Sequence, residues 1–441
     1  MIHAAAISVL ARSLVAGEPT VDAVHARAIR TLGRDWPWLR ALAARYVESF
    51  NGSTRPRHRD VVRFLIADTG FKRGLVRRRD KIAIAEWIAE PPRMEPVLAA
   101  QRWDLPAIET AGDLAEWLSV HPTQLDWFAD LKGLCAKLDR PKLQHFHYRI
   151  LAKRSGGVRL IESPKRQLKE MQRRILSLIL ERIPPHPAVQ GFVKGRSIVS
   201  FASPHAGKHV LLRLDLKDFF PAFPAARVQA LFRTLGYPET VADLLGGICS
   251  SATPRSLWKQ RPVEIGLNEW REAQNLYTRR HLPQGAPTSP ALANITAFRL
   301  DCRLSGLAKS AGAVYTRYAD DLAFSGDEEF ARRIERFSMH AVAVALEEGF
   351  DVNHHKTRIM RRGNRQVLAG IVVNERVNLR RADLEKLEAI LTNCVRFGPE
   401  SQNRENVPNF RAHLEGRIGF VEMVNRAKGQ RLRRIFETIR F

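Results

Sequence analysis

The sequence has few cysteines and no long apolar run. Its four cysteines lie far apart and never form a Cys-x-x-Cys pair; they are Cys135, Cys249, Cys302 and Cys394. This spacing argues against a zinc ribbon and is typical of a protein kept in the reducing cytoplasm, which is the location we expect. No apolar run approaches the ~18 residues that a membrane-spanning helix needs, so we expect no membrane association.

Acidic residues are also scarce relative to basic ones. The chain of 441 residues has 71 Lys and Arg but only 46 Asp and Glu, which gives a formal net charge of +25. Such an excess repels itself in a compact protein unless a polyanion neutralises part of it, and nucleic acid is the common polyanion. A generically basic surface is the alternative explanation.

The length and the residue pattern predict several packed units. A chain of 441 residues with 45% hydrophobic content is long enough for two to four of them. Residues 1–95 predict a helical N-terminal extension that reaches Pro91, and it is either a plain helical module or one that binds RNA. Residues 96–140 predict a helical linker module. Strand-like and helical segments alternate over 141–375, which predicts an α+β fold, whereas 376–441 is helical and basic.

One apolar strand carries an acid. The alternate leucines of residues 212–216 fall on one face of this strand, which places Asp215 on the other face. A carboxylate among apolar neighbours is costly unless positive charge compensates it. An ion pair between Asp215 and Arg213 is the simplest explanation, and a bound metal ion is the alternative.

A second stretch places two acids together. Residues 314–318 and 322–324 predict two antiparallel strands, joined by a tight turn near Asp320 and Asp321. Adjacent carboxylates repel each other unless cations hold them together. Two acids on a hairpin and one acid from another strand are what a pair of Mg²⁺ ions requires. Such a pair activates an attacking 3′-hydroxyl and stabilises the leaving pyrophosphate.

A loop rich in Gly and Pro lies between these two acidic segments. It spans residues 281–290 and precedes an apolar helix. Gly285 permits close approach of the backbone to a ligand. Thr288 or Ser289, followed by Pro290, predicts a helix start, where backbone N–H groups favour contact with a phosphate or a base. An ordinary junction between a loop and a helix is the alternative.

Taken in order, these three segments resemble the core motifs of reverse transcriptases. They read Leu-Asp-Leu-Lys-Asp-Phe-Phe, Leu-Pro-Gln-Gly-Ala-Pro-Thr-Ser-Pro and Tyr-Ala-Asp-Asp. Residues 153–159 resemble the fingers hairpin that closes on a triphosphate, and residues 190–197 the motif before the first catalytic acid. Residues 349–357 resemble the later lysine motif, and residues 368–374 the primer grip. The strong likeness covers about residues 145–375.

The resemblance implies an RNA-directed DNA polymerase with the α+β fold of a right hand. Fingers and palm would occupy residues 141–375, and a basic helical thumb would occupy 376–441. Two Mg²⁺ ions, with Mn²⁺ as a substitute, would be held by carboxylates and one backbone carbonyl. The implied metal ligands are Asp215, Leu216, Asp320 and Asp321.

The resemblance also implies roles for the residues around the metal ions. The catalytic set would be the three aspartates together with Lys356, which would donate a proton to pyrophosphate. Phe220 would be the steric gate that clashes with a ribose 2′-hydroxyl. The implied nucleotide-binding residues are Lys153, Arg159, Asp218, Phe219, Phe220 and Gln284. The implied primer and template contacts are Tyr318, Gly370, Arg431 and Arg434.

Within the family, the chain looks similar to retron enzymes. Residues 201–205 stand where retron enzymes have Asn-Ala-x-x-His, and here Ala202 and His205 match while Phe201 replaces Asn. Residues 368–370 stand where retron enzymes have Val-Thr-Gly, and only the last residue matches. The implied partners are a structured non-coding RNA template, an RNA–DNA hybrid and deoxynucleotides. A role in antiviral (anti-phage) defence follows by analogy, with room for an effector protein encoded nearby.

Two other functions stay open at this point. A different defence-associated reverse transcriptase, or one similar to group II intron enzymes, would share the core motifs but copy another RNA. A catalytically silent RNA-binding scaffold would keep the fold alone. The presence of all three acids together with Gln284 and Phe220 argues against that scaffold.

Overall fold

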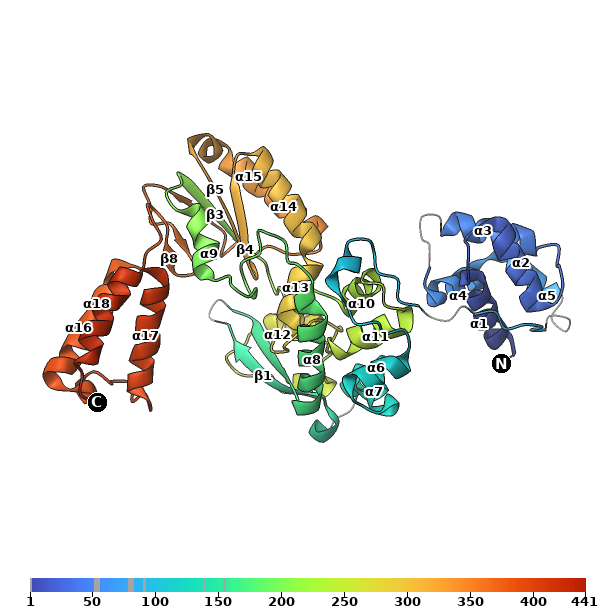
Figure 1. Cartoon of the computed structure of the whole chain (residues 1–441), viewed down its shortest axis with the longest axis horizontal. Helices are drawn as coiled ribbons and strands as arrows, with labels where there is room; N and C mark the ends of the chain where they lie inside the picture. The colour runs from blue at the N-terminus through green and yellow to red at the C-terminus, as the bar shows by residue number, and fades with distance from the viewer. Residues whose placement is uncertain (1, 51–55, 78–82, 90–92, 138–139, 154–155) are drawn as a thin grey trace. The chain divides into compact units, whose positions relative to one another are not determined.

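The chain divides into two compact units in the computed structural model (Figure 1). The first comprises residues 1–94 and the second residues 95–441, close to the boundary expected at residue 95. None of the helices in the described part is long and apolar enough to cross a membrane. The described residues are 2–50, 56–77, 83–89, 93–137, 140–153 and 156–441.

The first unit is a helical module with its own core. Apolar residues at helical spacing give each helix one apolar face, and these faces meet around Leu14, Leu42, Tyr46 and Leu65. The helices are α1 (Ile2–Val15), α2 (Val21–Leu32), α3 (Leu39–Ser49), α4 (His58–Ala67) and α5 (Thr69–Arg77). The RNA-binding role considered for this unit stays a prediction.

The expectation of helix as far as Pro91 is wrong for residues 83–89. These residues have no regular secondary structure. Their backbone bonds to another segment instead, because the Ala85 N–H donates to the Thr31 carbonyl at 2.8 Å. The side chain of Ile84 packs against the core of the first unit, which holds the segment in place.

The second unit begins with short helices and a hairpin. Helices α6 (Ala111–Leu118) and α7 (Pro122–Ala129) contact α11 (Glu239–Ile248), so the expected linker module is part of this unit. Strands β1 (Phe146–Ala152) and β2 (Val158–Pro164) pair antiparallel. Two residues of the expected fingers motif, Arg154 and Ser155, lie outside the described residues.

One face of the β1–β2 hairpin is covered by aromatic residues. Trp258, Trp270 and Tyr277 pack against Val158 and Leu160 of β2. Helix α8 (Arg166–Leu178) follows the hairpin and buries the apolar face that carries Leu168, Met171 and Ile175. The other helices of this region are α10 (Ala225–Thr234), α12 (Leu267–Tyr277) and α13 (Ser289–Thr296).

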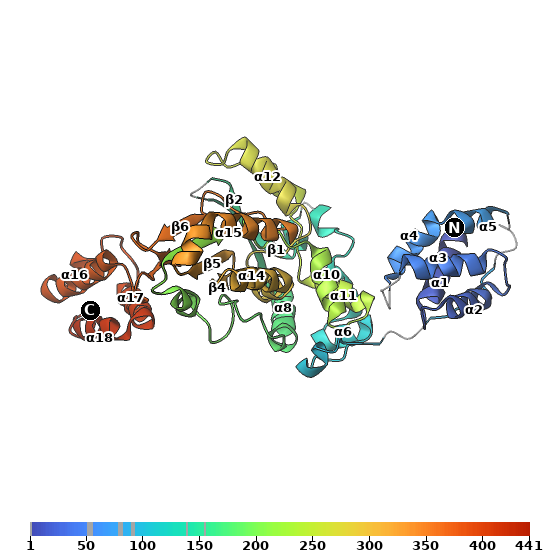
Figure 2. The same cartoon turned by 90° about the horizontal axis from the view of Figure 1, so that it is seen from above.

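A four-stranded antiparallel sheet lies at the centre of the second unit as described. Its strands run in the order β4-β5-β3-β6. Their bounds are β3 (Val210–Asp215), β4 (Val314–Tyr318), β5 (Asp321–Gly326) and β6 (Arg358–Arg361). Helices α14 (Phe298–Ser310) and α15 (Glu328–Glu347) pack against this sheet, as Figures 1 and 2 show. Phe324 of β5 contacts Phe337 of α15.

The opposite face of the sheet continues into a second core. Leu211 of β3 and Ala323 of β5 alternate with the residues that face α15, and they pack with Phe201 of α9 (Ile198–Ala202). This core extends to Leu391 and Ile418 in the C-terminal helices, drawn in red in Figure 1. The remaining elements are β7 (Val367–Leu368), β8 (Ile371–Val372), α16 (Arg381–Phe397), α17 (Phe410–Val424) and α18 (Arg426–Glu437).

Candidate active site

Three aspartates meet at one end of the sheet. Asp215 ends β3 and stands directly opposite Asp321, the first residue of β5. Asp320 lies in the turn between β4 and β5, where its carbonyl accepts a hydrogen bond from the Leu216 N–H at 2.9 Å. The turn is tight because Ala319 adopts a left-handed conformation with φ 54°. The sequence prediction of one strand acid beside two hairpin acids is therefore confirmed in its geometry.

Two basic side chains neutralise part of this acidic cluster. Lys356 Nζ donates to both carboxylate oxygens of Asp215, at 3.0 and 3.1 Å. Arg213 Nε and Nη2 donate to Asp321 Oδ1 at 2.8 and 2.6 Å. The simple expectation that Arg213 pairs with Asp215 is thus wrong. Arg213 and Asp321 belong to neighbouring strands, and the register of β3 and β5 brings them together.

The remaining repulsion appears in the pKa values of the acids. Burial first, and then the negative charges of Asp321 and Asp215, raise the pKa of Asp320 to about 6. Burial also raises the pKa of Asp321, although the Arg213 guanidinium opposes that shift. A cation bound among the three carboxylates would relieve the unfavourable interactions on Asp320.

The donor set fits a hard divalent cation. Carboxylate oxygens are the ligands that Mg²⁺ prefers, and Asp320 forms no ion pair among the described residues. No group of three or more His, Cys, Asp or Glu among the described residues is arranged to hold a metal ion in this structure. The carboxylates of Asp215 and Asp321 instead bond Lys356 and Arg213, which supply the compensating positive charge.

A buried arginine supports the turn that carries Asp320. The Arg317 side chain is fully buried and donates to both carboxylate oxygens of Asp301, at 2.8 and 2.7 Å. Its Nη1 also donates to the Asn294 side chain and to the Ala319 carbonyl, both at 3.1 Å. Sequence reasoning missed this role. The available signal was an arginine in the middle of an apolar strand, which requires a buried partner.

The Gln284 loop is fastened to the β1–β2 hairpin. The Glu162 N–H donates to the Gln284 carbonyl at 2.8 Å, and the buried Glu162 side chain pairs with His281 at 2.8 Å. Gly285 has φ +130°, and a Cβ on it would lie 2.9 Å from the Glu162 carbonyl oxygen. The backbone of Gly285 therefore lies close to β2, and its predicted close approach to a ligand stays a prediction. The predicted helix start is confirmed, since α13 begins at Ser289.

Comparison with known proteins adds to this geometry. Residues 151–412 match the family model described as reverse transcriptase (RNA-dependent DNA polymerase). The chain is 42% identical over 343 residues to the retron Mx65 reverse transcriptase of Myxococcus xanthus, covering 76% of this chain and 72% of that relative. The chain belongs to the reverse transcriptase family. It is an RNA-directed DNA polymerase of the bacterial retron-like kind.

Other retron relatives agree with this assignment. The chain is 36% identical to the retron Mx162 reverse transcriptase of Myxococcus xanthus, covering 74% of this chain and 66% of the relative. It is 31% identical to the retron Ec86 reverse transcriptase of Escherichia coli, covering 65% and 79%. A solved structure of the foamy viral protease-reverse transcriptase in complex with RNA/DNA hybrid covers 57% of this chain and 26% of its own, at 13% identity. Its TM-score of 0.28 is too low to carry an argument.

We call the end of the sheet that carries Asp215, Asp320 and Asp321 the acidic edge. In this reverse transcriptase, one of the residues expected to bind phosphate lies beside it. Lys153, at the end of the β1–β2 hairpin, pairs with Asp218 at 2.6 Å. Asp218 follows β3 and has φ 49°, so the backbone turns sharply there. Arg159 lies on β2 with an exposed side chain. Both basic residues come from the hairpin, and their contact with a triphosphate stays a prediction.

The retron-like segment at residues 201–205 packs against the β4–β5 hairpin. His205 is fully buried, with its two ring nitrogens 2.6 Å from Ser325 Oγ and 2.7 Å from Thr316 Oγ1. The Thr316 hydroxyl donates to the Phe201 carbonyl at 3.0 Å. Burial lowers the pKa of His205 to about 3, so the ring is neutral at pH 7. The segment therefore supports β4 and β5 from behind.

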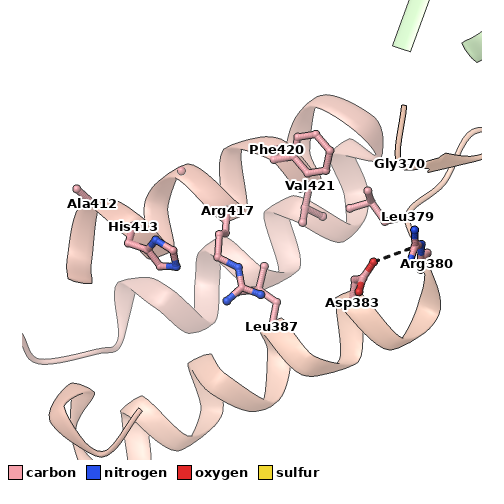
Figure 3. Close-up of a pocket in the computed structure, with 11 residues that line it drawn as sticks. Gly370, Leu379, Arg380, Asp383, Leu387, Ala412, His413, Arg417, Phe420 and Val421 are labelled. Carbon is pink, nitrogen blue, oxygen red and sulfur yellow. Dashed lines mark ion pairs between the residues drawn. The ribbon is translucent and has the colours of Figure 1, made fainter. Parts of the chain in front are cut away.

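A groove lies between two of the C-terminal helices. It has a volume of about 730 Å³ and is drawn in Figure 3. Arg417 of α17 extends toward Leu387 of α16, and Arg380 lies at one end of the groove beside Asp383. The lining residues are Gly370, Leu379, Arg380, Asp383, Leu387, Ala412, His413, Gly416, Arg417, Phe420 and Val421.

Of the residues expected to contact primer and template, Gly370 lines this groove, whereas Tyr318, Arg431 and Arg434 do not. Gly370 lines the groove, and it has φ 84° in the turn between β7 and β8. Arg431 pairs with Glu388 of α16, whereas Arg434 is exposed on α18, and neither lines the groove. Tyr318 is half-buried at the end of β4. The structure therefore brings Gly370 together with Arg380 and Arg417.

Proposed function

We propose that this enzyme is a retron reverse transcriptase that copies a structured non-coding RNA into DNA by two-metal nucleotidyl transfer. The observation that carries the proposal is the meeting of Asp215, Asp320 and Asp321 at one end of the sheet. When bound there, two Mg²⁺ ions, or Mn²⁺ in their place, would activate the primer hydroxyl and stabilise the departing pyrophosphate. The Leu216 carbonyl, next to Asp215, is the fourth proposed ligand.

The residues of this chain would bind and orient the substrates. Lys153 and Arg159 would hold the triphosphate, and the backbone N–H groups of Asp218 and Phe219 would shape its pocket. Gln284 would contact the incoming nucleotide from a loop whose backbone is fixed by Glu162. Phe220, which is half-buried, would exclude a ribose 2′-hydroxyl.

Lys356 would be the proton donor to pyrophosphate. Its ammonium donates to Asp215, so it already lies next to the atoms where negative charge develops during the reaction. From this position the Lys356 ammonium would give its proton to the leaving pyrophosphate, and Asp215 would hold the ammonium in place. Tyr318 and Gly370 would support the primer terminus.

The chain would fold as a right hand around its template. The β1–β2 hairpin would act as fingers, the four-stranded sheet as palm, and helices α16 to α18 as thumb. The groove between α16 and α17 would contact the RNA–DNA duplex, with Arg431 and Arg434 binding phosphates outside it. A Cβ added at Gly416 or Gly419 would meet nothing within 4 Å, so this side of α17 leaves room for close approach of a nucleic acid strand.

The retron assignment is tested by the nucleic acid that the enzyme makes. The enzyme is purified from cells together with its bound nucleic acid, which is then sequenced. We expect a single structured RNA joined through a 2′,5′ linkage to DNA copied from it. Repetitive or untemplated DNA would contradict the retron assignment. A role in anti-phage defence is an analogy with the family alone.

A further inference from the structure

A row of aromatic rings joins segments that are next to the three aspartates in the sequence. The ring of Phe192 lies 6.2 Å from that of Phe220 and 6.2 Å from that of Tyr318, centroid to centroid. Phe220 contacts Phe219 at 5.6 Å on one side, and Tyr318 contacts the buried Phe201 at 5.8 Å on the other. These separations are those of favourable aromatic pairs. Phe192 thus bridges two separate segments that flank the aspartates.

Phe192 is also the exposed member of this row. Its side chain is 52% exposed, whereas Phe201 and Phe219 are buried. An exposed large apolar side chain is common on protein surfaces and needs no explanation by itself. Here the ring lies beside the proposed steric gate Phe220, which is half-buried. The feature to explain is therefore the position of the Phe192 ring next to Phe220, and not its exposure.

The backbone at Phe192 is held in an unfavourable conformation. Phe192 has φ 59°, a left-handed conformation that is an outlier for a bulky side chain. The preceding residues fix it there. The Gln190 N–H donates to the Arg317 carbonyl at 2.7 Å, and the Asn294 side chain donates to the Gly191 carbonyl at 2.9 Å. A Cβ at Gly191 would lie 2.8 Å from the backbone nitrogen of Ala319.

We propose that Phe192 is a specificity-determining residue that braces the ring of Phe220 against an incoming ribonucleotide. The proposal rests on the proposed function, because it requires Phe220 to be the gate. A gate excludes a 2′-hydroxyl only while its ring cannot rotate away. Phe219 restrains Phe220 on the buried side, and Phe192 restrains it on the open side. The fixed left-handed backbone directs the Phe192 ring to that place.

The test measures the selectivity for deoxynucleotides over ribonucleotides. Single-nucleotide incorporation on an RNA template gives kcat and KM for dGTP and for GTP. In Phe192→Gly, we expect the ratio of the two kcat/KM values to fall at least tenfold, while kcat for dGTP changes less than threefold. Phe192→Tyr keeps a ring and should retain the selectivity of the wild type. Phe298→Ala, which removes another exposed phenylalanine, should do so as well.

Two further variants distinguish an effect of the Phe192 ring on Phe220 from an effect of the backbone and from direct contact between Phe192 and the substrate. Glycine relieves the strain at φ 59°, whereas Phe192→Ala keeps it, so the loss of selectivity must appear in both. In a Phe220→Ala background, Phe192→Gly should cause no further loss, because Phe192 acts through Phe220.

The results that would overturn the proposal are distinct from failure of the proposed function. Unchanged selectivity in Phe192→Gly with an unchanged melting temperature overturns it. A loss only in Phe192→Gly assigns the effect to the backbone, and an undiminished loss in the Phe220→Ala background assigns it to direct substrate contact; each also overturns the proposal. If the wild type does not incorporate dGTP, or Phe220→Ala keeps full selectivity, the proposed function or its gate fails instead.

Discussion

Single residues near the three aspartates decide how the segments of the candidate active site are held. Gly285 is the clearest case, because its φ of +130° and its contact with the Glu162 carbonyl leave no room for a side chain. His205 is a second case, since its neutral ring links Ser325 to Thr316 inside the protein. For both residues the predicted effect is on the stability of the fold, which can be measured without a substrate.

Gly285→Ala should destabilise the protein by about 1–3 kcal/mol, since alanine adds backbone strain and a Cβ clash. The melting temperature and a urea titration measure this loss. Gly306→Ala is the matched control, because Gly306 lies in α14 with nothing within 4 Å of its Cβ position. The control should be stabilised by up to about 1 kcal/mol, as expected in a helix interior. Equal effects of the two substitutions would contradict this reading of Gly285.

His205 should make the stability depend on pH. The pKa of His205 is about 3 in the folded protein and ordinarily 6.5, so the unfolded chain binds the proton first. The stability that the neutral ring provides is therefore complete above pH 6.5 and is lost as the pH falls toward 3. The loss is roughly 1 kcal/mol per pH unit.

The contribution of His205 is isolated by difference, because carboxylates titrate in the same range. Urea unfolding of the wild type and of His205→Asn is compared between pH 4.5 and 7. The difference in unfolding free energy between the wild type and His205→Asn should become smaller as the pH falls. The wild type loses the contribution of its neutral histidine, whereas asparagine does not titrate. A gap that stays constant over this range would show that His205 does not have the lowered pKa.

At the scale of elements, the β4–β5 hairpin depends on a buried ion pair. Arg317→Met should destabilise the protein by about 3–5 kcal/mol, because it leaves the Asp301 carboxylate buried without its partner. The double variant Arg317→Met/Asp301→Leu removes both charges and should lose less stability than Arg317→Met alone. Urea unfolding measures the wild type, the single variants Arg317→Met and Asp301→Leu, and the double variant. A double variant as unstable as the sum of the two single variants would contradict the pairing.

The strands of this hairpin were predictable, but the contacts that hold them were not. Residues 314–318 and 322–324 alternate in a way that predicts two strands, and Asp320 and Asp321 predict the turn. The partner of Arg213 depends on the register between β3 and β5, which local sequence does not determine. The Arg317 network joins residues from α13, α14 and β4, so no single segment of sequence contains it.

At the scale of the whole molecule, the net charge of +25 favours nucleic acid binding. The groove lined by Arg380 and Arg417 is the proposed place for that contact. Arg380→Ala and Arg417→Ala should each weaken binding of an RNA–DNA duplex. Each should also reduce the slope of log K against log salt by about one. Fluorescence anisotropy at several salt concentrations measures this slope. Arg332→Ala, an exposed residue of α15, is the control and should leave the slope unchanged. An unchanged slope in both groove variants would remove the groove from the duplex interface.

Much of the second unit followed from a resemblance in the sequence, whereas the first unit did not. The core motifs predicted that Asp215 lies beside Asp320 and Asp321, because the order of the motifs along the chain matches a known family. For the first unit, the only basis for prediction was the helical spacing of its apolar residues. That spacing did not exclude a helix at residues 83–89. There the backbone bonds to α2 rather than to itself, a long-range contact that no local pattern predicts.

The most direct test of the account is Mg²⁺-dependent primer extension on an RNA template. The wild type should extend the primer with deoxynucleotides, and Asp320→Asn and Asp321→Asn should each reduce kcat at least a hundredfold, because each removes a proposed metal ligand. Asp126→Asn, an exposed residue of α7, should extend at the wild-type rate. DNA synthesis that persists at the wild-type rate in folded Asp320→Asn and Asp321→Asn would contradict the central claim.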